Sequence, residues 1–180
     1  MTITRGTSLR ELAFLVGDAL YGVGETAVLS GGGAAAIYSE GAYMSRDLDF
    51  VFAMHSVVGR VSSAPLVELG FVQRGGGYIH PDSDYTVEFP RGPLAIGEEI
   101  VTQWDTRTDD AGRILHILTP TDCVRDRLIS FLHFNDYSAL EQALAVARSQ
   151  HVNLDGIQLW CAREGKPEKF DLFYHRLDSA

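Results

Sequence analysis

The stretch VLSGGGAAAIYSEGAYMSRDLDF, Val28 to Phe50, carries the pattern that decides the fold. An apolar run with the length of a short strand ends at Ser30, and three consecutive glycines follow it directly. The alanine-rich segment 34–39 then favours a short helix, and a second apolar run contains two aspartates one residue apart. The predicted order is therefore strand, glycine loop, short helix and strand.

The two aspartates, Asp47 and Asp49, point to the same side of the strand predicted over 48–53, because side chains alternate along a strand. Their spacing along the strand is roughly 6.5–7 Å, and Leu48 and Phe50 point to the other face, into the core. Adjacent carboxylates repel each other, so burying them is unfavourable unless a cation or donors compensate. This arrangement favours a divalent metal, especially Mg²⁺ shared with substrate phosphates. An Asp-x-Asp alone is also common at strand ends.

The three glycines, Gly31, Gly32 and Gly33, supply a complementary feature. Without side chains they let the backbone approach a ligand closely, and the helix that follows offers free N–H groups to a phosphate. The Ser30 hydroxyl adds a further donor. Three glycines alone are usually a turn, so it is their order and separation from the aspartates that favours a phosphate site.

The segments GGGAAAIY and SRDLDFVF together resemble the GG-[TS]-A…S-x-DLDF form of the nucleotidyltransferase superfamily signature. This form occurs in minimal nucleotidyltransferases and in abortive-infection and toxin-type relatives. The resemblance implies that the glycine pair contacts the phosphates of a nucleoside triphosphate (NTP) and that the aspartates hold Mg²⁺, with two ions in an active enzyme. The matching positions are Gly31, Gly32, Asp47, Asp49 and the hydroxyl residue Ser45. Arg46 departs from the pattern, because relatives often carry an arginine before the hydroxyl residue and not after it.

A third carboxylate on a neighbouring strand completes the site in that family. In DYTVEFP the best match is Glu88, a charge inside an otherwise apolar strand predicted over 84–89. Its alternative role is a strand-end glutamate that faces solvent next to Pro90. Asp82 and Asp84 are weaker candidates, because they lie on the approach to a hairpin.

The sequence becomes helical after residue 118. Thr119 and Pro120 predict a helix start, with helices over 122–133, 137–150, 155–164 and 167–177. The resemblance places a basic residue of the first of these helices on the nucleotide phosphates. Arg127 matches it, with Arg125 as its neighbour, and a solvated basic helix face is the alternative. We therefore expect a nucleotidyltransferase-like core over 1–118, with the helical part 119–180 packed on it.

Within 1–118, local signals predict several further elements. Ser8 and Glu11 form a potential capping box for a helix over 8–22. Strands are predicted over 26–30, 99–104 and 113–118, and a hairpin over 71–80 with its turn at the glycines 75–77. The predicted fold class is α/β (α+β), with a mixed sheet flanked by helices and a helical C-terminal region.

Composition limits the class of protein. The net charge of −9 argues against binding to extended duplex nucleic acid, which depends on clustered Lys and Arg. Cys123 and Cys161 share no metal-binding or redox spacing, which favours two reduced thiols in a cytoplasmic protein. No apolar run approaches the roughly 20 residues needed to cross a bilayer, so no membrane partner is expected.

The function expected from these features is Mg²⁺-dependent transfer of a nucleoside monophosphate (NMP) from an NTP to an acceptor hydroxyl. A small molecule or a protein hydroxyl fits the acidic charge better than a long nucleic acid, and an RNA end stays open because of the toxin-type relatives. The alternative is a catalytically silent protein of the same fold that binds a nucleotide or a partner protein in a toxin–antitoxin or regulatory pair.

Overall fold

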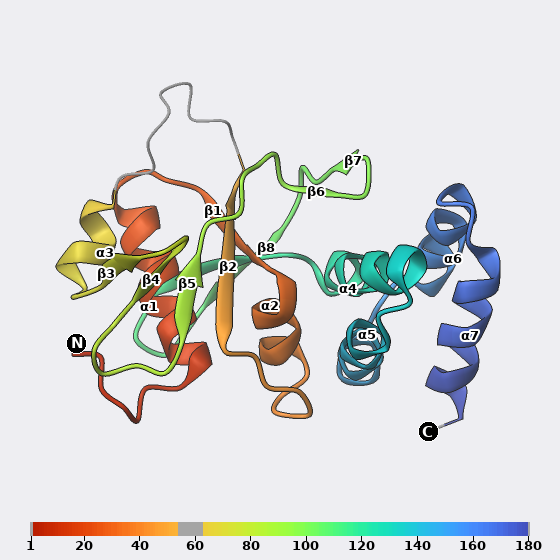
Figure 1. Cartoon of the computed structure of the whole chain (residues 1–180), viewed down its shortest axis with the longest axis horizontal. Coiled ribbons are helices and arrows are strands. Elements are labelled where there is room, and N and C mark those ends of the chain that lie inside the picture. The colour runs from red at the N-terminus through yellow and green to blue at the C-terminus, as the bar shows by residue number, and fades with distance from the viewer. Residues whose placement is uncertain (1, 54–62, 180) are drawn as a thin grey trace.

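The centre of the molecule is a seven-stranded mixed sheet, seen in a computed structural model that describes residues 2–53 and 63–179 (Figure 1). The strand order is β3-β4-β5-β2-β1-β9-β8, with parallel pairs β5–β2 and β1–β9. The strands are β1 Ala27–Ser30, β2 Asp47–Phe52, β3 Val72–Arg74, β4 Gly77–Ile79, β5 Thr86–Glu88, β8 Asp105–Thr108 and β9 Ile114–Ile117.

The helices fall into an N-terminal set and a C-terminal set. The first set is α1 Leu9–Gly22, α2 Gly31–Tyr38 and α3 Ala64–Glu68. The second set is α4 Pro120–Phe134, α5 Tyr137–Ser149, α6 Leu154–Arg163 and α7 Pro167–Asp178. The predicted fold class, a mixed sheet flanked by helices and followed by a helical region, is confirmed.

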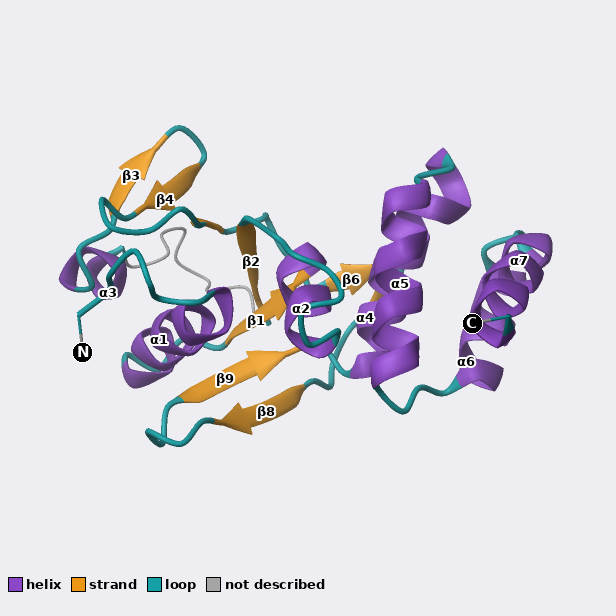
Figure 2. Cartoon of the chain, turned by 90° about the horizontal axis from the view of Figure 1, so that it is seen from below, coloured by secondary structure: helices purple, strands orange, loops and turns teal. Residues whose placement is uncertain are grey.

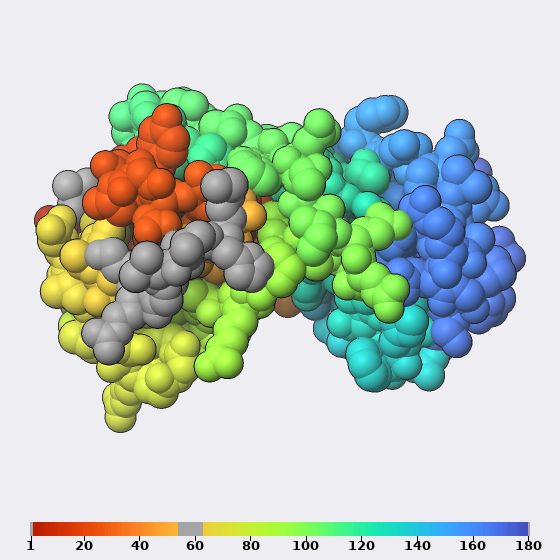
Figure 3. Space-filling model, turned by 90° about the horizontal axis from the view of Figure 1, so that it is seen from above, coloured from red at the N-terminus to blue at the C-terminus, as the bar shows by residue number. Residues whose placement is uncertain are grey.

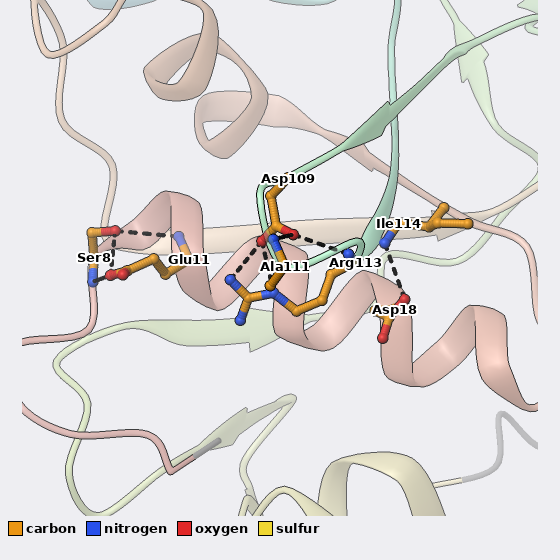
Figure 4. Close-up of polar contacts among 7 residues, drawn as sticks. All are labelled: Ser8, Glu11, Asp18, Asp109, Ala111, Arg113 and Ile114. Carbon is orange, nitrogen blue, oxygen red and sulfur yellow. Dashed lines mark hydrogen bonds and ion pairs between the residues drawn. The ribbon is translucent and has the colours of Figure 1, made fainter.

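Helix α1 is fixed by contacts at both ends (Figure 4). At its start, Ser8 and Glu11 form the predicted capping box: the Glu11 amide donates to Ser8 Oγ, and Ser8 N–H donates to the Glu11 carboxylate. Near its end, Asp18 Oδ1 accepts a hydrogen bond of 3.0 Å from the amide of Ile114, the first residue of β9. The Asp18 bond ties α1 to β9, and the helix packs on both β1 and β9.

The three glycines are the first turn of α2, so the prediction of a glycine loop followed by a helix at residue 34 was wrong. The helix packs too closely on β2 for side chains at this turn. A Cβ on Gly33 would lie 2.9 Å from the carbonyl oxygen of Asp47, well inside normal contact. The glycines therefore allow close packing of the first turn of α2 on β2.

The secondary structure of residues 95–108 differs from the predicted strand over 99–104. It contains the small hairpin of β6 Ala95–Ile96 and β7 Glu99–Ile100, followed by β8, which pairs with β9 at the edge of the sheet. The sequence of β8 is polar, DTRT, with every other side chain exposed. An edge strand without an apolar face gives no alternating hydrophobic signal, which explains why it was missed.

The C-terminal helices begin and end at local signals. Thr119 caps α4 through the Asp122 amide, with Pro120 in the first turn. Asn135, in the left-handed conformation, ends α4, and Asp136 caps α5 by accepting from the amide of Ala139 at 3.1 Å. Both helices pack against α2, with α6 and α7 on their far side (Figure 2).

The molecule is elongated (Figure 3). From above, a sheet-bearing lobe and a helical lobe, in cyan and blue, meet at a narrower middle that the green segment covers. Apolar residues of both lobes belong to one contiguous buried core, and Cys123 and Cys161 lie in it as free thiols. Among the helices of the described residues, none is both long and apolar enough to cross a bilayer.

Candidate active site

The centre of the candidate site is Asp49, on the middle strand β2. The register of the sheet places Asp49 between Ser30 on β1 and Glu88 on β5. Leu48 and Phe50 are fully buried on the opposite face, as predicted from the strand alternation. Glu88, about forty residues away in sequence, therefore lies beside Asp49 because β5 runs parallel to β2.

The environment of Asp49 disfavours its charge. The side chain is half-buried, and this burial, the neighbouring carboxylate of Glu88 and, to a lesser extent, Asp47 and Asp126 raise its pKa to about 6, from an ordinary value near 3.8. The positive charge of Arg127 opposes the rise only in part. Asp49 therefore lies in a region of excess negative charge.

Gly31 brings the start of α2 directly against Asp49. A Cβ at this position would lie 2.4 Å from Asp49 Oδ2, and the backbone φ of +65° is one that side chains rarely adopt. Any other residue would collide with the carboxylate. The amide of Gly31 donates a hydrogen bond of 3.1 Å to Asp126 Oδ2, which reaches across from α4.

Asp126 is a site residue that the sequence reasoning missed. Its Oδ2 also accepts from Arg127, at 2.6 Å from Nη2 and 3.0 Å from Nε, and both side chains are about one-fifth exposed. Arg127 Nη1 donates to Gln142 on α5 at 3.4 Å. The signal was present in the segment VRDRL, where one carboxylate stands between two arginines on a half-buried helix.

Arg127 therefore contacts a carboxylate, whereas the resemblance assigned its position to the nucleotide phosphates. Burial lowers the pKa of Arg127, but the charge and hydrogen bonds of Asp126 raise it more, with a smaller contribution from Asp49. Arg127 is thus a cation paired with Asp126, and Asp49 is a weaker acidic neighbour. Its predicted role in nucleotide binding stays a prediction.

The two serines support the backbone around the carboxylates. Ser30 Oγ donates to the carbonyl oxygen of Asp49 at 3.2 Å and makes no hydrogen bond to the turn that it precedes. Ser45 Oγ donates to the carbonyl oxygen of Asp47 at 3.0 Å. A Cβ on Gly32 would lie 3.2 Å from Ser45 Oγ, so the second glycine and the hydroxyl residue are neighbours, as in the motif.

The outer carboxylates, Asp47 and Glu88, are exposed, and neither hydrogen-bonds or forms an ion pair through its carboxylate with another residue in the described ranges. Asp82 and Asp84 lie before β5 and outside this cluster in the register. Across residues 2–53 and 63–179, no three Asp, Glu, His or Cys side chains are already arranged around a common metal position. A shared ion would require Asp47 and Glu88 to turn toward Asp49.

Comparisons with known proteins bear on this arrangement. No protein-family model matches the sequence, and neither does any curated protein. Among solved structures, the chain resembles an antigenic nucleotidyltransferase-like protein from Paracoccidioides brasiliensis, with a TM-score of 0.56 and 14% sequence identity. The match covers 81% of this chain and 78% of that protein. The fold is nucleotidyltransferase-like. At this identity the likeness establishes the fold alone.

Proposed function

We propose that the chain is a Mg²⁺-dependent nucleotidyltransferase that moves an NMP from an NTP to an acceptor hydroxyl. The observation that carries the proposal is the position of Asp49: the register of β2 and β5 sets it beside Glu88, and its carboxylate lies against Gly31 in the first turn of α2. Carboxylates for a metal and backbone N–H groups for a phosphate thus lie side by side. The nucleotidyltransferase-like fold and the predicted motif agree with this chemistry.

The donor set fits a hard divalent cation. Carboxylate oxygens are the ligands that Mg²⁺ prefers. Asp49 is half-buried, and a cation would neutralise the negative charge of the carboxylates around it. Asp47 and Glu88 are exposed, with carboxylates uncommitted to any described residue, so they can turn toward an ion beside Asp49. When bound, Mg²⁺ supplies Lewis-acid stabilisation of the charge on phosphoryl oxygens.

The chain's own residues would bind and orient the reactants. The amides of the first turn of α2 would bind phosphate oxygens, with that of Gly31 taking part once Asp126 releases it. One of the carboxylates of the cluster would accept the proton of the acceptor hydroxyl as its oxygen attacks the α-phosphorus. Pyrophosphate would then leave, and holding the reactants in line would provide much of the rate enhancement.

The test is transfer of label from each of the four NTPs, labelled at the α-phosphate, to components of a cell extract with Mg²⁺ present. Asp49→Asn should lower transfer by roughly 100-fold or more, because Lewis-acid stabilisation is worth several kcal/mol and about 1.4 kcal/mol is a tenfold change. Asp82→Asn removes an exposed carboxylate outside the cluster and should keep wild-type transfer. If folded wild-type protein neither transfers label nor binds any NTP, the proposal is wrong.

One observation favours a second function, a catalytically silent protein that binds a nucleotide or a partner protein. Asp126 already occupies the Gly31 amide and neutralises Arg127, so both groups that would bind phosphate have an internal anionic partner. Calorimetry with Mg²⁺-ATP distinguishes the two functions. Binding by the wild type together with label transfer supports the enzyme, whereas binding without transfer, or binding only after Asp126→Ala, supports the silent protein.

A further inference from the structure

A large cavity lies next to the carboxylate cluster. Its volume is about 1180 Å³, which exceeds the roughly 300–1,000 Å³ of ordinary small-molecule sites. The walls come from the chain before α1 and its first turn, the second half of α2, the segment 41–46 and residues 84–85. None of the residues assigned above to the metal lines it.

The cavity and the candidate active site share one wall. Tyr43 and Ser45 line the cavity, and a Cβ on Gly32 would lie 3.4 Å from the Tyr43 hydroxyl oxygen and 3.2 Å from Ser45 Oγ. Ser45 is also hydrogen-bonded to the backbone of Asp47. The cavity therefore borders the first turn of α2 and the start of β2 through Tyr43 and Ser45, so an acceptor bound in it would be a neighbour of the candidate active site.

Arginines outnumber carboxylates in the lining of the cavity, although the chain as a whole is acidic. Arg5, Arg10 and Arg46 all line it, together with the carboxylates of Glu40 and Asp84. Within the described ranges, none of the three arginines forms an ion pair, and Arg10 instead lies over the ring of Phe14, 5.5 Å from its centroid. Six other arginines do pair with carboxylates, at positions 107, 113, 125, 127, 163 and 176.

We propose that this cavity binds the acceptor and that the acceptor carries a phosphate group, an inference that rests on the proposed transferase function. Guanidinium groups bind phosphate oxygens in paired hydrogen bonds, and three exposed arginines without ion-pair partners line this one hollow. The size fits a molecule as large as a nucleotide. A polycationic acceptor would meet three arginines and only two carboxylates, Glu40 and Asp84, and is disfavoured.

Each reacting group then has an assigned place. The arginines hold the phosphate of the acceptor. The hydroxyl of the acceptor points past Ser45 toward the carboxylate cluster. A new bond forms between the hydroxyl oxygen and the α-phosphorus of the NTP, and the bond from that phosphorus to the bridging oxygen breaks. Pyrophosphate leaves with the electron pair, and the hydroxyl proton passes to a carboxylate of the cluster.

Binding is tested without metal or NTP, on the Asp49→Asn protein in the presence of a chelator, so that the result does not depend on catalysis. The probes are ribose 5-phosphate, AMP and a 5′-phosphorylated trinucleotide. Calorimetry measures the dissociation constant of each. We expect Arg10→Gln and Arg46→Gln each to weaken binding by at least about 10-fold, because a charge-assisted hydrogen bond is worth roughly 1.5–3 kcal/mol. Arg74→Gln, an exposed arginine of β3 outside the cavity, is the matched control and should bind as before.

The probes also identify the source of the phosphate. Arginine-dependent binding of the small probes points to a small phosphorylated acceptor, and binding of the trinucleotide alone points to an RNA end. No binding of any probe, or equal binding by the arginine variants and the parent, overturns the cavity inference even if label transfer occurs. If wild-type protein transfers no label while arginine-dependent binding persists, the proposed function fails and the phosphate site stands.

A kinetic measurement separates an acceptor site from a further triphosphate site. With an acceptor in hand, Arg10→Gln and Arg46→Gln should raise the KM for the acceptor by about 10-fold and leave the KM for the NTP unchanged. A rise in the KM for the NTP instead would mean that the arginines hold the triphosphate, and the acceptor assignment would be wrong.

Discussion

Replacing Asp49 by asparagine should stabilise the metal-free protein at neutral pH. Asparagine has the same shape but no charge, so it removes the repulsion that burial, Glu88, Asp47 and Asp126 impose on the carboxylate. An acid with a raised pKa in the folded state loses stability as the pH rises, because the unfolded chain releases its proton first. The loss begins near the ordinary pKa of 3.8 and is complete above about 6.

The size of the effect follows from the two pKa values. The interval from 3.8 to about 6 is roughly two pK units, or about 3 kcal/mol at 1.36 kcal/mol for each. Asp49 is only partly buried, so screening by solvent reduces this to about 1–2 kcal/mol. Asp49→Asn should therefore gain about that much over the wild type at about pH 8, and almost nothing at about pH 4.

The assay is urea unfolding of both proteins with a chelator present, between about pH 4 and about pH 8. Effects of other titrating groups largely cancel in the difference between the two proteins. Asp82→Asn, at an exposed carboxylate, is the control and should stay within about 0.5 kcal/mol of the wild type at every pH. A difference that does not grow with pH, or a variant less stable than the wild type near pH 8, would refute the electrostatic account of this site.

Three further predictions concern the surroundings of Asp49. Gly31→Ala should cost about 1–3 kcal/mol of unfolding free energy and abolish transfer, because the added Cβ would lie 2.4 Å from Asp49 Oδ2 and the backbone φ is +65°. The control is Gly22→Ala, whose Cβ would meet nothing within 4 Å. This control should leave the thermal melting curve unchanged. Asp126→Ala should tighten ATP binding about 10-fold in calorimetry by freeing the Gly31 amide and Arg127, at a cost of about 1–3 kcal/mol in stability. Weaker binding would contradict this reasoning. Mg²⁺ at a hundredfold excess over its dissociation constant should stabilise the wild type by about 2.7 kcal/mol, and chelation or Asp49→Asn should remove most of this gain.

The sequence by itself determined the features that depend on neighbours along the chain. The capping box of Ser8 and Glu11 and the Thr119-Pro120 start placed two helices to within a residue or two. Strand alternation put Asp47 and Asp49 on one face and buried Leu48, because the two-residue period of a strand is a local property.

Only the tertiary structure decided what those carboxylates meet. Asp126 reaches the Gly31 amide from 95 positions away, and no local pattern carries that contact. The same holds for the cavity, whose arginines come from the chain before α1, the first turn of α1 and the segment before β2. The glycines were read as a loop because their low helix propensity is a local cost, yet close packing of α2 on β2 outweighs it. Contacts of this kind depend on strand order and helix packing, which arise only when distant segments bury their apolar faces together.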